Sequence, residues 1–524
     1  MQQQTNPTRD LTGQTAILWF FGFVGFWTLL WSALPGLIHH GYRPDVVELQ
    51  FIGPEWVLAT RKHPMLPAWI LESVNIVTGR AFAAPFIASQ LCVLLTLWSV
   101  WSLGRKVLSE RLALAGTFAM LPYWFFTVES IKFNQNIVLT AFWTLAVFLL
   151  YQAIQTNRTA YWFGTGTALG LAFQSKYSAL FLVAAMLLFM LTNSNTRNFW
   201  KKTGLYITAL VALLIFLPHL IWLWQDNFET LHYARMQNAG KEADLWSHVL
   251  APFQFIFCEL GYLICSMVIL IPCLGWKWHK KNLSDAHEVT GRQLLLFCIG
   301  VPFVMHIALA LLAGKSLNAD YGAAFWPFFG ILLLLCFRAS DDFRSFRSVF
   351  RRACFFELVM VAALLGQSLL SPYITNSARR FHFPMQSLGA ECDRLWSSRY
   401  AVPCPYVSGD WWCAGNAAIT MKDRPSVHFY WSNIDKENIK PTGTWSEDAD
   451  VNTHGGLILW PLSEGENPKN NEQNPIVPEY VGRRFPSAEV QKEILVLPYS
   501  TGVPIAPLRI GVAIVSPPEG NGHE

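Results

Sequence analysis

Charged residues are scarce in this sequence. Lys, Arg, Asp and Glu together make up 14% of its 524 residues, whereas apolar residues make up 52%. Soluble domains carry roughly a quarter charged residues, so the composition excludes an ordinary soluble protein. The net charge of +4 is small and spread along the chain, so the sequence also lacks the basic patch that nucleic-acid binding needs. The composition indicates a membrane protein.

We expect neither a cleavable leader nor a cysteine pattern of the kind that binds a metal ion. After polar residues 1–15, the first apolar run is too long for a signal-peptide core and has no small-residue cleavage site, so we expect a retained first helix. Seven of the ten cysteines lie in apolar runs, where a thiol behaves as a small apolar group. Cys392, Cys404 and Cys413 lie in the polar tail. An oxidising compartment would allow one disulfide among them, and the sequence does not say which two cysteines form it. Their spacing matches no zinc site, so no metal site is predicted.

Long apolar runs occupy most of the first 371 residues. They predict a polytopic α-helical membrane protein with about eleven transmembrane helices, several of them shorter than the ~20 residues that a perpendicular helix needs. The runs are 15–38, 81–103, 112–128, 136–156, 161–175, 178–192, 204–224, 251–275, 293–314, 322–337 and 353–371.

Basic residues are distributed unevenly between alternate loops, and this predicts the orientation. One set of loops holds Arg105, Lys106, Arg111, Arg158, Arg197, Lys201, Lys202, Lys277, Lys280, Lys281, Arg292, Arg338, Arg344, Arg347, Arg351 and Arg352. The other set holds fewer, among them Arg43, Arg61, Lys62, Lys132, Lys176, Arg235, Lys241 and Lys315. The positive-inside rule therefore places the N-terminus in the cytoplasm and the tail outside, as expected for a multi-pass protein of the bacterial inner membrane with a periplasmic tail.

Residues 372–524 differ in character from the rest. Gly, Pro and Asn become frequent, and apolar runs shorten to strand length, separated by turn residues. We therefore predict two domains, a transmembrane domain over 1–371 and a periplasmic α/β or mixed-β domain over 372–524. The strands are predicted near Val407, 427–431, 457–460, 494–497 and 510–515.

The first outer loop, residues 39–66, concentrates residues that suit acid–base chemistry and phosphate binding. Asp45 and Glu48 are three apart and would share one face of a helix, and Glu55 follows seven residues later. Lys62 and His63 end the loop just before an apolar helix. Carboxylates can orient or deprotonate an acceptor, while cations neutralise a phosphate leaving group. The alternative is that these side chains are simply solvated and the cations snorkel to lipid head groups.

Several motifs follow one another along residues 15–240. The first outer loop carries Asp-x-x-Glu, Glu55-Trp56 and Lys62-His63-Pro64. The further motifs are Leu121-Pro122, 133–136 with Trp143, the Gly-rich segment 166–177 ending in Lys-Tyr, and 218–222 with Phe228 and Tyr233. In this order they resemble glycosyltransferase family 39, and the first outer loop resembles that family's first periplasmic loop. The family belongs to the GT-C superfamily and includes dolichyl-phosphate-mannose protein mannosyltransferases and bacterial enzymes that add aminoarabinose or galacturonic acid to lipopolysaccharide.

The resemblance implies transfer of a sugar from a polyprenyl-phosphate donor to an extracytoplasmic acceptor, lipopolysaccharide core or lipid A, with inversion. It implies catalytic roles for Asp45 and Glu48, with Asp45 taking a proton from the acceptor. The residues implied in binding the donor phosphate are Lys62, His63, Lys176 and Arg235. Those implied in substrate binding are Glu55, Asn134 and Tyr177.

The sequence departs from the family pattern at three places. Val46 and Val47 separate Asp45 from Glu48, where many members have adjacent Asp-Glu, and this form resembles the galacturonic-acid branch. Met65 replaces the second proline of the commoner His-Pro-Pro. Asn134 and Asn136 stand where many members have an aspartate, and neither can act as a base, which leaves Asp45 as the candidate for the essential carboxylate.

Two other classes of function stay open on the sequence alone. A transporter or flippase tends to show two-fold repeats and interrupted helices at the midplane, and we find no repeat here. A non-catalytic envelope assembly protein would not require the carboxylate and basic loop. No cofactor is assigned, and a divalent cation stays open because relatives differ in their use of metal.

Overall fold

The computed structural model describes residues 13–60, 62–230, 232, 245–276, 278–313, 317–430, 446, 448–462 and 477–518. The chain divides into two compact units. The helical unit contains the residues up to 35, residues 62–67 and residues 82–364. The sheet unit contains residues 36–61, residues 68–81 and the residues from 365 onward. The first outer loop therefore contributes mainly to the same unit as the C-terminal residues.

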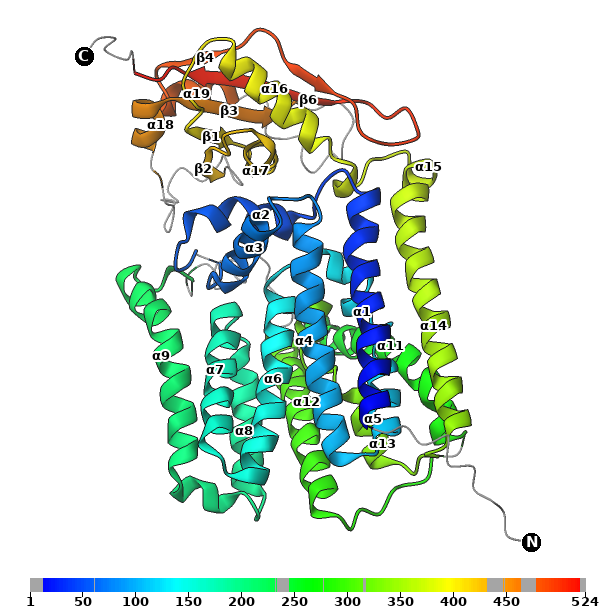
Figure 1. Ribbon diagram of the computed structural model, residues 1–524. Helices are drawn as coiled ribbons and strands as arrows, with labels where there is room; N and C mark the ends of the chain where they lie inside the picture. The colour runs from blue at the N-terminus through cyan, green and yellow to red at the C-terminus, as the bar shows by residue number, and fades with distance from the viewer. Residues whose placement is uncertain are drawn as a thin grey trace. The chain divides into compact units, whose positions relative to one another are not determined.

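Within the described residues, seven helices are long and apolar enough to cross a bilayer. They are α1 (Gly13–Ile38), α4 (Ala84–Val107), α6 (Gln135–Thr156), α9 (Thr203–Gln225), α11 (Leu245–Leu274), α12 (Ala286–Ala313) and α14 (Phe343–Leu365), drawn in Figure 1. Four other predicted apolar runs form the shorter helices α5 (Glu110–Phe118), α7 (Thr159–Ser175), α8 (Ala179–Thr192) and α13 (Phe329–Cys336). The predicted polytopic helical fold is confirmed.

Two of the predicted runs are only partly helical, and proline explains why. The run 112–128 stops being α-helical after Phe118, just before Pro122, and the run 322–337 becomes α-helical only after Pro327. Proline lacks the backbone N–H that a helix interior requires. Short 3₁₀ turns take up the remaining residues. They are η3 (Trp124–Phe126), η4 (Val128–Ile131) and η6 (Ala319–Gly322), and a similar turn, η5 (Arg197–Lys201), precedes α9.

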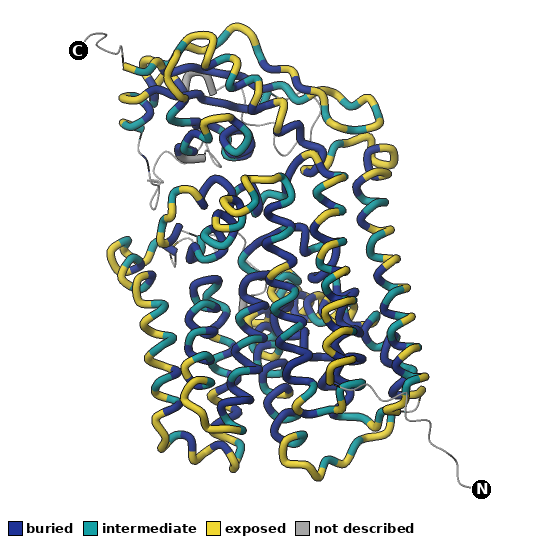
Figure 2. Tube along the Cα trace, viewed as in Figure 1, coloured by how far each residue is buried: buried dark blue, intermediate teal, exposed yellow. Residues whose placement is uncertain are grey.

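The helices of this unit differ in how much of their surface the protein covers. In α4 and α6, 72% of the most apolar window is buried, against 17% in α9 and 22% in α1. Figure 2 shows the same contrast, with α4 and α6 mostly dark and α9 largely exposed. Apolar side chains on α9, including Leu210, Leu214 and Trp224, are more than half exposed. An exposed apolar face of this kind is the surface that a lipid bilayer covers.

Helices α7 and α9 pack closely because α7 carries glycine at the contact. A Cβ on Gly166 would lie 2.5 Å from the carbonyl oxygen of Thr208, and one on Gly170 would lie 2.7 Å from Cβ of Ile215. Small residues four apart are the usual means by which membrane helices approach one another. The Thr208 hydroxyl also donates to the carbonyl oxygen of Trp162 across this contact, at 2.8 Å.

The sheet unit is built around a six-stranded mixed sheet in the order β2-β1-β3-β6-β4, with β5 also paired to β6. Strands β2, β1 and β3 are parallel, and β6 is antiparallel to β3, β4 and β5. The strands are β1 (Tyr406–Gly409), β2 (Ser426–Tyr430), β3 (Gly456–Pro461), β4 (Ala488–Val490), β5 (Leu495–Leu497) and β6 (Leu508–Val515). The predicted sheet-containing C-terminal region is confirmed, and β4 is an addition to the predicted strands.

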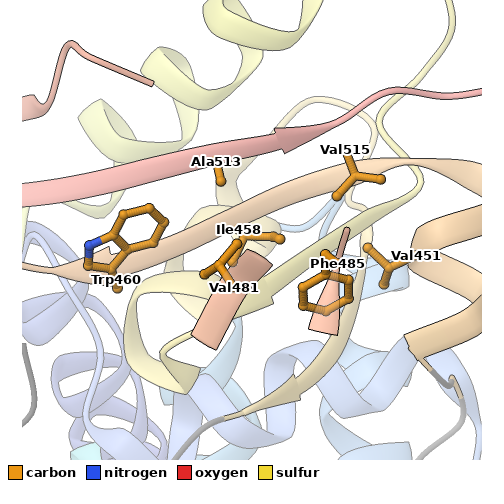
Figure 3. Packing of buried hydrophobic residues seen from close by; sticks show 7 residues of the cluster. All are labelled: Val451, Ile458, Trp460, Val481, Phe485, Ala513 and Val515. Atoms are coloured by element: carbon orange, nitrogen blue, oxygen red, sulfur yellow. The ribbon is translucent and has the colours of Figure 1, made fainter. Parts of the chain in front are cut away.

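Helices and turns accompany this sheet. They are α2 (Pro44–Ile52), η2 (Gly53–Glu55), α3 (Leu66–Val77), the π-helical turn η7 (Gly366–Leu370), α15 (Ser371–Thr375), η8 (Arg380–His382), α16 (Met385–Ser397), α17 (Trp411–Thr420), α18 (Asp448–His454) and α19 (Val477–Arg484). On one face of the sheet, side chains of β3 and β6 pack with α18 and α19, as Figure 3 shows. This cluster consists of Val451, Ile458, Trp460, Val481, Phe485, Ala513 and Val515. Burial of these apolar side chains provides the main force that holds the layer together.

Candidate active site

The predicted carboxylate pair lies on a short helix of the sheet unit. Pro44 occupies the first turn of α2, a position that proline favours, and Asp45 follows in the same turn, where a negative charge suits the helix N-terminus. Asp45 and Glu48 are both partly exposed, while Val46 and Val47 between them are fully buried. The two carboxylates therefore share the open face of α2, as their spacing predicts.

Glu55 is tied to the sheet. It ends the turn η2, and its Oε1 accepts a hydrogen bond of 2.6 Å from the hydroxyl of Ser426 at the start of β2. Partial burial raises the pKa of Glu55, and the hydrogen bond from Ser426 opposes this shift. A substrate-binding role for Glu55 stays a prediction, but the structure gives its carboxylate a clear structural partner.

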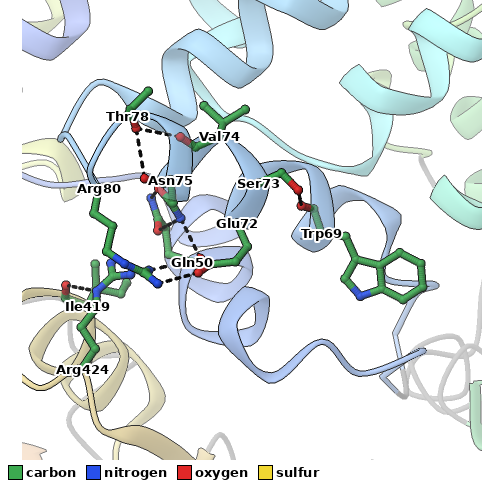
Figure 4. A network of polar contacts seen from close by, with 10 residues as sticks. All are labelled: Gln50, Trp69, Glu72, Ser73, Val74, Asn75, Thr78, Arg80, Ile419 and Arg424. Atoms are coloured by element: carbon green, nitrogen blue, oxygen red, sulfur yellow. Dashed lines mark hydrogen bonds and ion pairs between the residues drawn. The ribbon is translucent and has the colours of Figure 1, made fainter.

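A buried polar network joins α2 to α3 (Figure 4). The side-chain amides of Gln50 and Asn75 exchange hydrogen bonds of 2.8 and 3.4 Å. Asn75 also donates to Glu72, whose carboxylate forms a 2.7 Å ion pair with Arg80. Because Glu72, Asn75 and Gln50 are almost fully buried, loss of one member would remove a hydrogen-bond partner from a buried polar group. The network fixes the helix that carries Asp45.

The same helix also packs on α17 of the C-terminal region. A Cβ on Gly415 would come within 2.8 Å of the Phe51 ring and 3.0 Å of a Val47 methyl group. Glycine at this position therefore allows α2 and α17 to approach closely. The sequence motif around Asp45 gave no sign of this long-range contact.

Two neighbouring side chains hold Lys176 of the helical unit in place. It follows the last residue of α7, and its ammonium group donates a 2.7 Å hydrogen bond to the side-chain oxygen of Asn136. The same nitrogen lies 4.2 Å from the centre of the Tyr321 ring, within range of a cation–π interaction. Three distant segments of the chain therefore position one ammonium group.

His63 lies close enough to both predicted lysines for their charges to act on it. Burial, together with the positive charges of Lys176 and Lys62, lowers the pKa of His63 to about 3. Lys62, His63 and Lys176 thus form one group within the helical unit, here called the cationic cluster. His63 is neutral near pH 7 in this surrounding, so it offers a hydrogen bond to an anion while the lysines supply the charge.

The shifted pKa of His63 leads to a prediction for stability. The pKa of His63 is lower in the folded chain than the 6.5 of an unfolded one, so the unfolded chain takes up a proton first as the pH falls. The folded state should therefore lose stability between about pH 6.5 and pH 3, and less so in His63→Asn. Thermal unfolding in detergent at pH 7 and pH 4 measures the difference, and equal losses of Tm in the two proteins would contradict the prediction.

Two other predicted binding residues have structural partners in the helical unit. The side-chain oxygen of Asn134 caps α6 by accepting hydrogen bonds from the backbone N–H groups of Asn136 and Ile137. The hydroxyl of Tyr177 lies 2.6 Å from Nε2 of His219 in α9. Substrate contact by Asn134 and Tyr177 stays a prediction. Arg235, the remaining predicted phosphate ligand, lies outside the described residues.

The turn η6 joins several charged groups, and the sequence did not predict this. Asp320 forms a 2.9 Å ion pair with Lys132, which also lies 3.2 Å from Glu129. The next residue, Tyr321, contacts Lys176. The buried Glu259 of α11 lies against Gly322, where a Cβ would be 2.0 Å from its carboxylate, and accepts a 2.7 Å hydrogen bond from the Trp326 indole. The sequence offers one signal, an ionisable residue inside an apolar run, and this signal marks Glu259 and His306 but not Lys132 or Asp320.

Metal ligands do not gather in the described part of the chain. No three His, Cys, Asp or Glu side chains there lie close enough together to hold an ion.

The fold of the chain resembles solved structures of other proteins. The chain resembles the crystal structure of ArnT from Cupriavidus metallidurans in the apo state, with a TM-score of 0.58 and 12% identity over 96% of this chain and 99% of that one. The form of the same protein bound to undecaprenyl phosphate gives a TM-score of 0.57 and 13% identity over the same shares. The protein is a multi-pass membrane protein with the GT-C fold, as predicted.

The match to a family of known sequences covers a smaller part of the chain than the structural match does. A family model described as dolichyl-phosphate-mannose-protein mannosyltransferase matches residues 62–222. This segment begins at Lys62 and includes His63, Lys176 and Tyr177. No curated protein matches the chain in sequence.

Proposed function

We propose that this protein is a membrane glycosyltransferase that moves a sugar from a polyprenyl-phosphate donor to an acceptor outside the cytoplasm. The observation that carries the proposal is the cationic cluster, in which the charges of Lys62 and Lys176 act on His63 and Asn136 and Tyr321 hold the ammonium group of Lys176. The cluster falls within the segment that matches the mannosyltransferase family model. The likeness of the fold to a protein solved with undecaprenyl phosphate supports a lipid-phosphate donor.

The chemistry of the cluster follows from its charge. When the sugar leaves its donor, negative charge builds on the departing phosphate, and fixed cations in a partly dehydrated site stabilise that charge more than water does. Lys176 is suited to this task because Asn136 and Tyr321 already hold its ammonium group. The ammonium group of Lys176 therefore needs to move little as negative charge builds on the phosphate.

The acceptor is activated by a carboxylate in this proposal. Asp45, on the open face of α2, takes the proton from an acceptor hydroxyl as the sugar is displaced with inversion, and Glu48 supports it or contacts the sugar. An acceptor that is already a phosphate anion needs no base, and Asp45 then only orients it. The Asp-x-x-Glu form favours galacturonic acid or a related sugar, with lipopolysaccharide core or lipid A as the acceptor at the periplasmic side of the inner membrane.

Purified protein in vesicles tests the activity. We expect sugar transfer from a polyprenyl-phosphate sugar to a glycolipid acceptor, with one free polyprenyl phosphate released for each sugar moved. Passage of intact donor across the bilayer without release would instead indicate a flippase and overturn the proposal. Mass spectrometry of envelope glycolipids from cells lacking the protein should show the loss of one sugar mass, which identifies both sugar and acceptor.

A further inference from the structure

Two short basic segments lie side by side in the sheet unit. Residues 39–43 follow α1 directly, and residues 379–382 follow shortly after α15. The backbone N–H groups of His40 and Gly41 donate to the carbonyl oxygen of Phe381, at 2.8 and 3.0 Å. Neither segment contains an acidic residue. The fold therefore gathers positive charge from two distant parts of the chain.

Two buried histidines fix these segments on the π-helical turn η7. Nδ1 of His382 accepts a hydrogen bond of 3.1 Å from the backbone N–H of Arg379, and Nε2 of His382 lies 2.7 Å from the carbonyl oxygen of Ser368. Nε2 of His39 lies 2.9 Å from the hydroxyl of the same serine. Burial, together with the positive charges of Arg43 and of nearby histidines, lowers the pKa of His39 to about 3, and burial also lowers the pKa of His382. Both histidines are therefore neutral near pH 7 and serve as a scaffold.

The arginines of the two segments remain accessible. Arg379 and Arg380 are exposed and Arg43 is partly exposed, and the three are here called the arginine cluster. In the described part of the chain, none of them forms an ion pair with a carboxylate. The guanidinium group of Arg380 lies 4.5 Å from the centre of the Trp412 ring, and its charge also acts on Asp410, whose side chain caps α17. The arginine cluster therefore carries an excess of positive charge.

Exposed apolar side chains precede the arginines in both parts of the chain. Leu37 is 80% exposed at the end of α1, and Ile374 is 78% exposed in α15. The two apolar spans to which they belong end at Ile38 and Thr375, so the arginines follow at the depth of the lipid head groups. In the orientation predicted from the loops this is the outer side, where basic residues beside membrane spans are depleted. The positive-inside bias therefore does not explain the arginine cluster.

We propose that the arginine cluster binds the phosphate of an anionic phospholipid, whose acyl chains run along the exposed side chains of Leu37 and Ile374. Guanidinium groups bind phosphate oxygens through paired hydrogen bonds of fixed geometry. A head group of net negative charge fits arginines without carboxylate partners better than a zwitterionic one, whose ammonium group they repel. The site belongs to the sheet unit, whereas the cationic cluster belongs to the helical unit, and lipid binding here does not depend on sugar transfer.

Removing the two exposed arginines tests the proposal. Native mass spectrometry of the purified full-length protein measures bound phosphatidylglycerol. Arg379→Gln combined with Arg380→Gln should weaken this binding at least about 10-fold. The matched control combines Arg394→Gln with Arg399→Gln, which removes two arginines of the same unit that already pair with glutamates, and it should bind like the wild type. Equal affinity of the two double variants, or equal affinity of the wild type for phosphatidylglycerol and phosphatidylcholine, would overturn the proposal.

A labelling experiment locates the lipid without relying on a variant that has to fold. Phosphatidylglycerol with a photoreactive group in its acyl chain should label the peptides that contain Leu37 and Ile374. Unlabelled phosphatidylglycerol should compete, whereas phosphatidylcholine and inorganic phosphate should not. Equal competition by either of these two would overturn the proposal, and stronger competition by a phosphorylated glycolipid would assign the arginine cluster to the acceptor instead. Neither measurement uses sugar transfer, so failure of the proposed function would leave both results unchanged.

Discussion

Replacing Asp45 by asparagine is expected to lower kcat of sugar transfer by about 10²–10⁴-fold, the contribution of a positioned general base. Asparagine keeps the size and shape of the side chain but cannot accept the proton of an acceptor hydroxyl. The donor phosphate does not depend on this carboxylate, so KM for the donor should change little. Initial rates with purified protein, measured at saturating donor, give the result directly.

Two carboxylates of the sheet unit, Glu391 and Glu48, provide control substitutions for Asp45→Asn. Glu391→Gln removes an exposed carboxylate of α16 that pairs with Arg394 three residues later, and full activity is expected. Glu48→Gln should cost less than Asp45→Asn, because Glu48 has the supporting role. Normal membrane insertion and Tm of Asp45→Asn, checked first, exclude misfolding. An Asp45→Asn protein with wild-type turnover on a hydroxyl acceptor would refute the assignment of a base.

Lys176→Met is expected to lower kcat/KM for the donor by about 10²–10³-fold, the usual effect of removing one group that stabilises developing negative charge. Methionine keeps an unbranched stem of similar length, so the loss reports the charge rather than packing. Lys176→Arg keeps the charge but changes its geometry, and an intermediate activity is expected. Steady-state rates at several donor concentrations separate kcat from KM.

Lys201→Met serves as the matched control for Lys176. Lys201 lies on the exposed turn η5, apart from the cationic cluster, and its loss should not affect transfer. Binding of the product offers a second measurement, since polyprenyl phosphate should compete with the donor less well in Lys176→Met. Equal inhibition of wild type and variant by polyprenyl phosphate would exclude Lys176 as a phosphate ligand.

Patterns local in sequence predicted much of this molecule. Each predicted apolar run contains a helix, because a long uncharged segment has few other ways to satisfy its backbone in a bilayer. The Asp45–Glu48 spacing predicted a shared face, and the helix α2 provides it. Five of the six described strands of the C-terminal region, all but β4, followed from short apolar runs between turn residues. These features depend only on neighbours along the chain.

Contacts between distant segments could not be read in the same way. Lys176 was identified through its motif, but Tyr321 lies in a different part of the sequence with no motif to connect them. Likewise, nothing local indicated that Glu55 would bind Ser426, or that Gln50 and Asn75 would pair in the interior. An apolar cavity in the helical unit is lined by residues of α6, α7, α8 and α9, and the sequence of each helix alone resembles any lipid-facing segment.

The position of η6 late in the chain has a consequence for biosynthesis. Asp320 follows its partner Lys132 by 188 residues, so the ion pair forms only after the intervening helices have entered the membrane. A chain terminated between α9 and α12 would already contain Lys132 and Lys176 but would lack Asp320, Tyr321 and the contact of Gly322 with Glu259. Such fragments would lack the late contacts that hold Lys132, Lys176 and Glu259 in the folded protein.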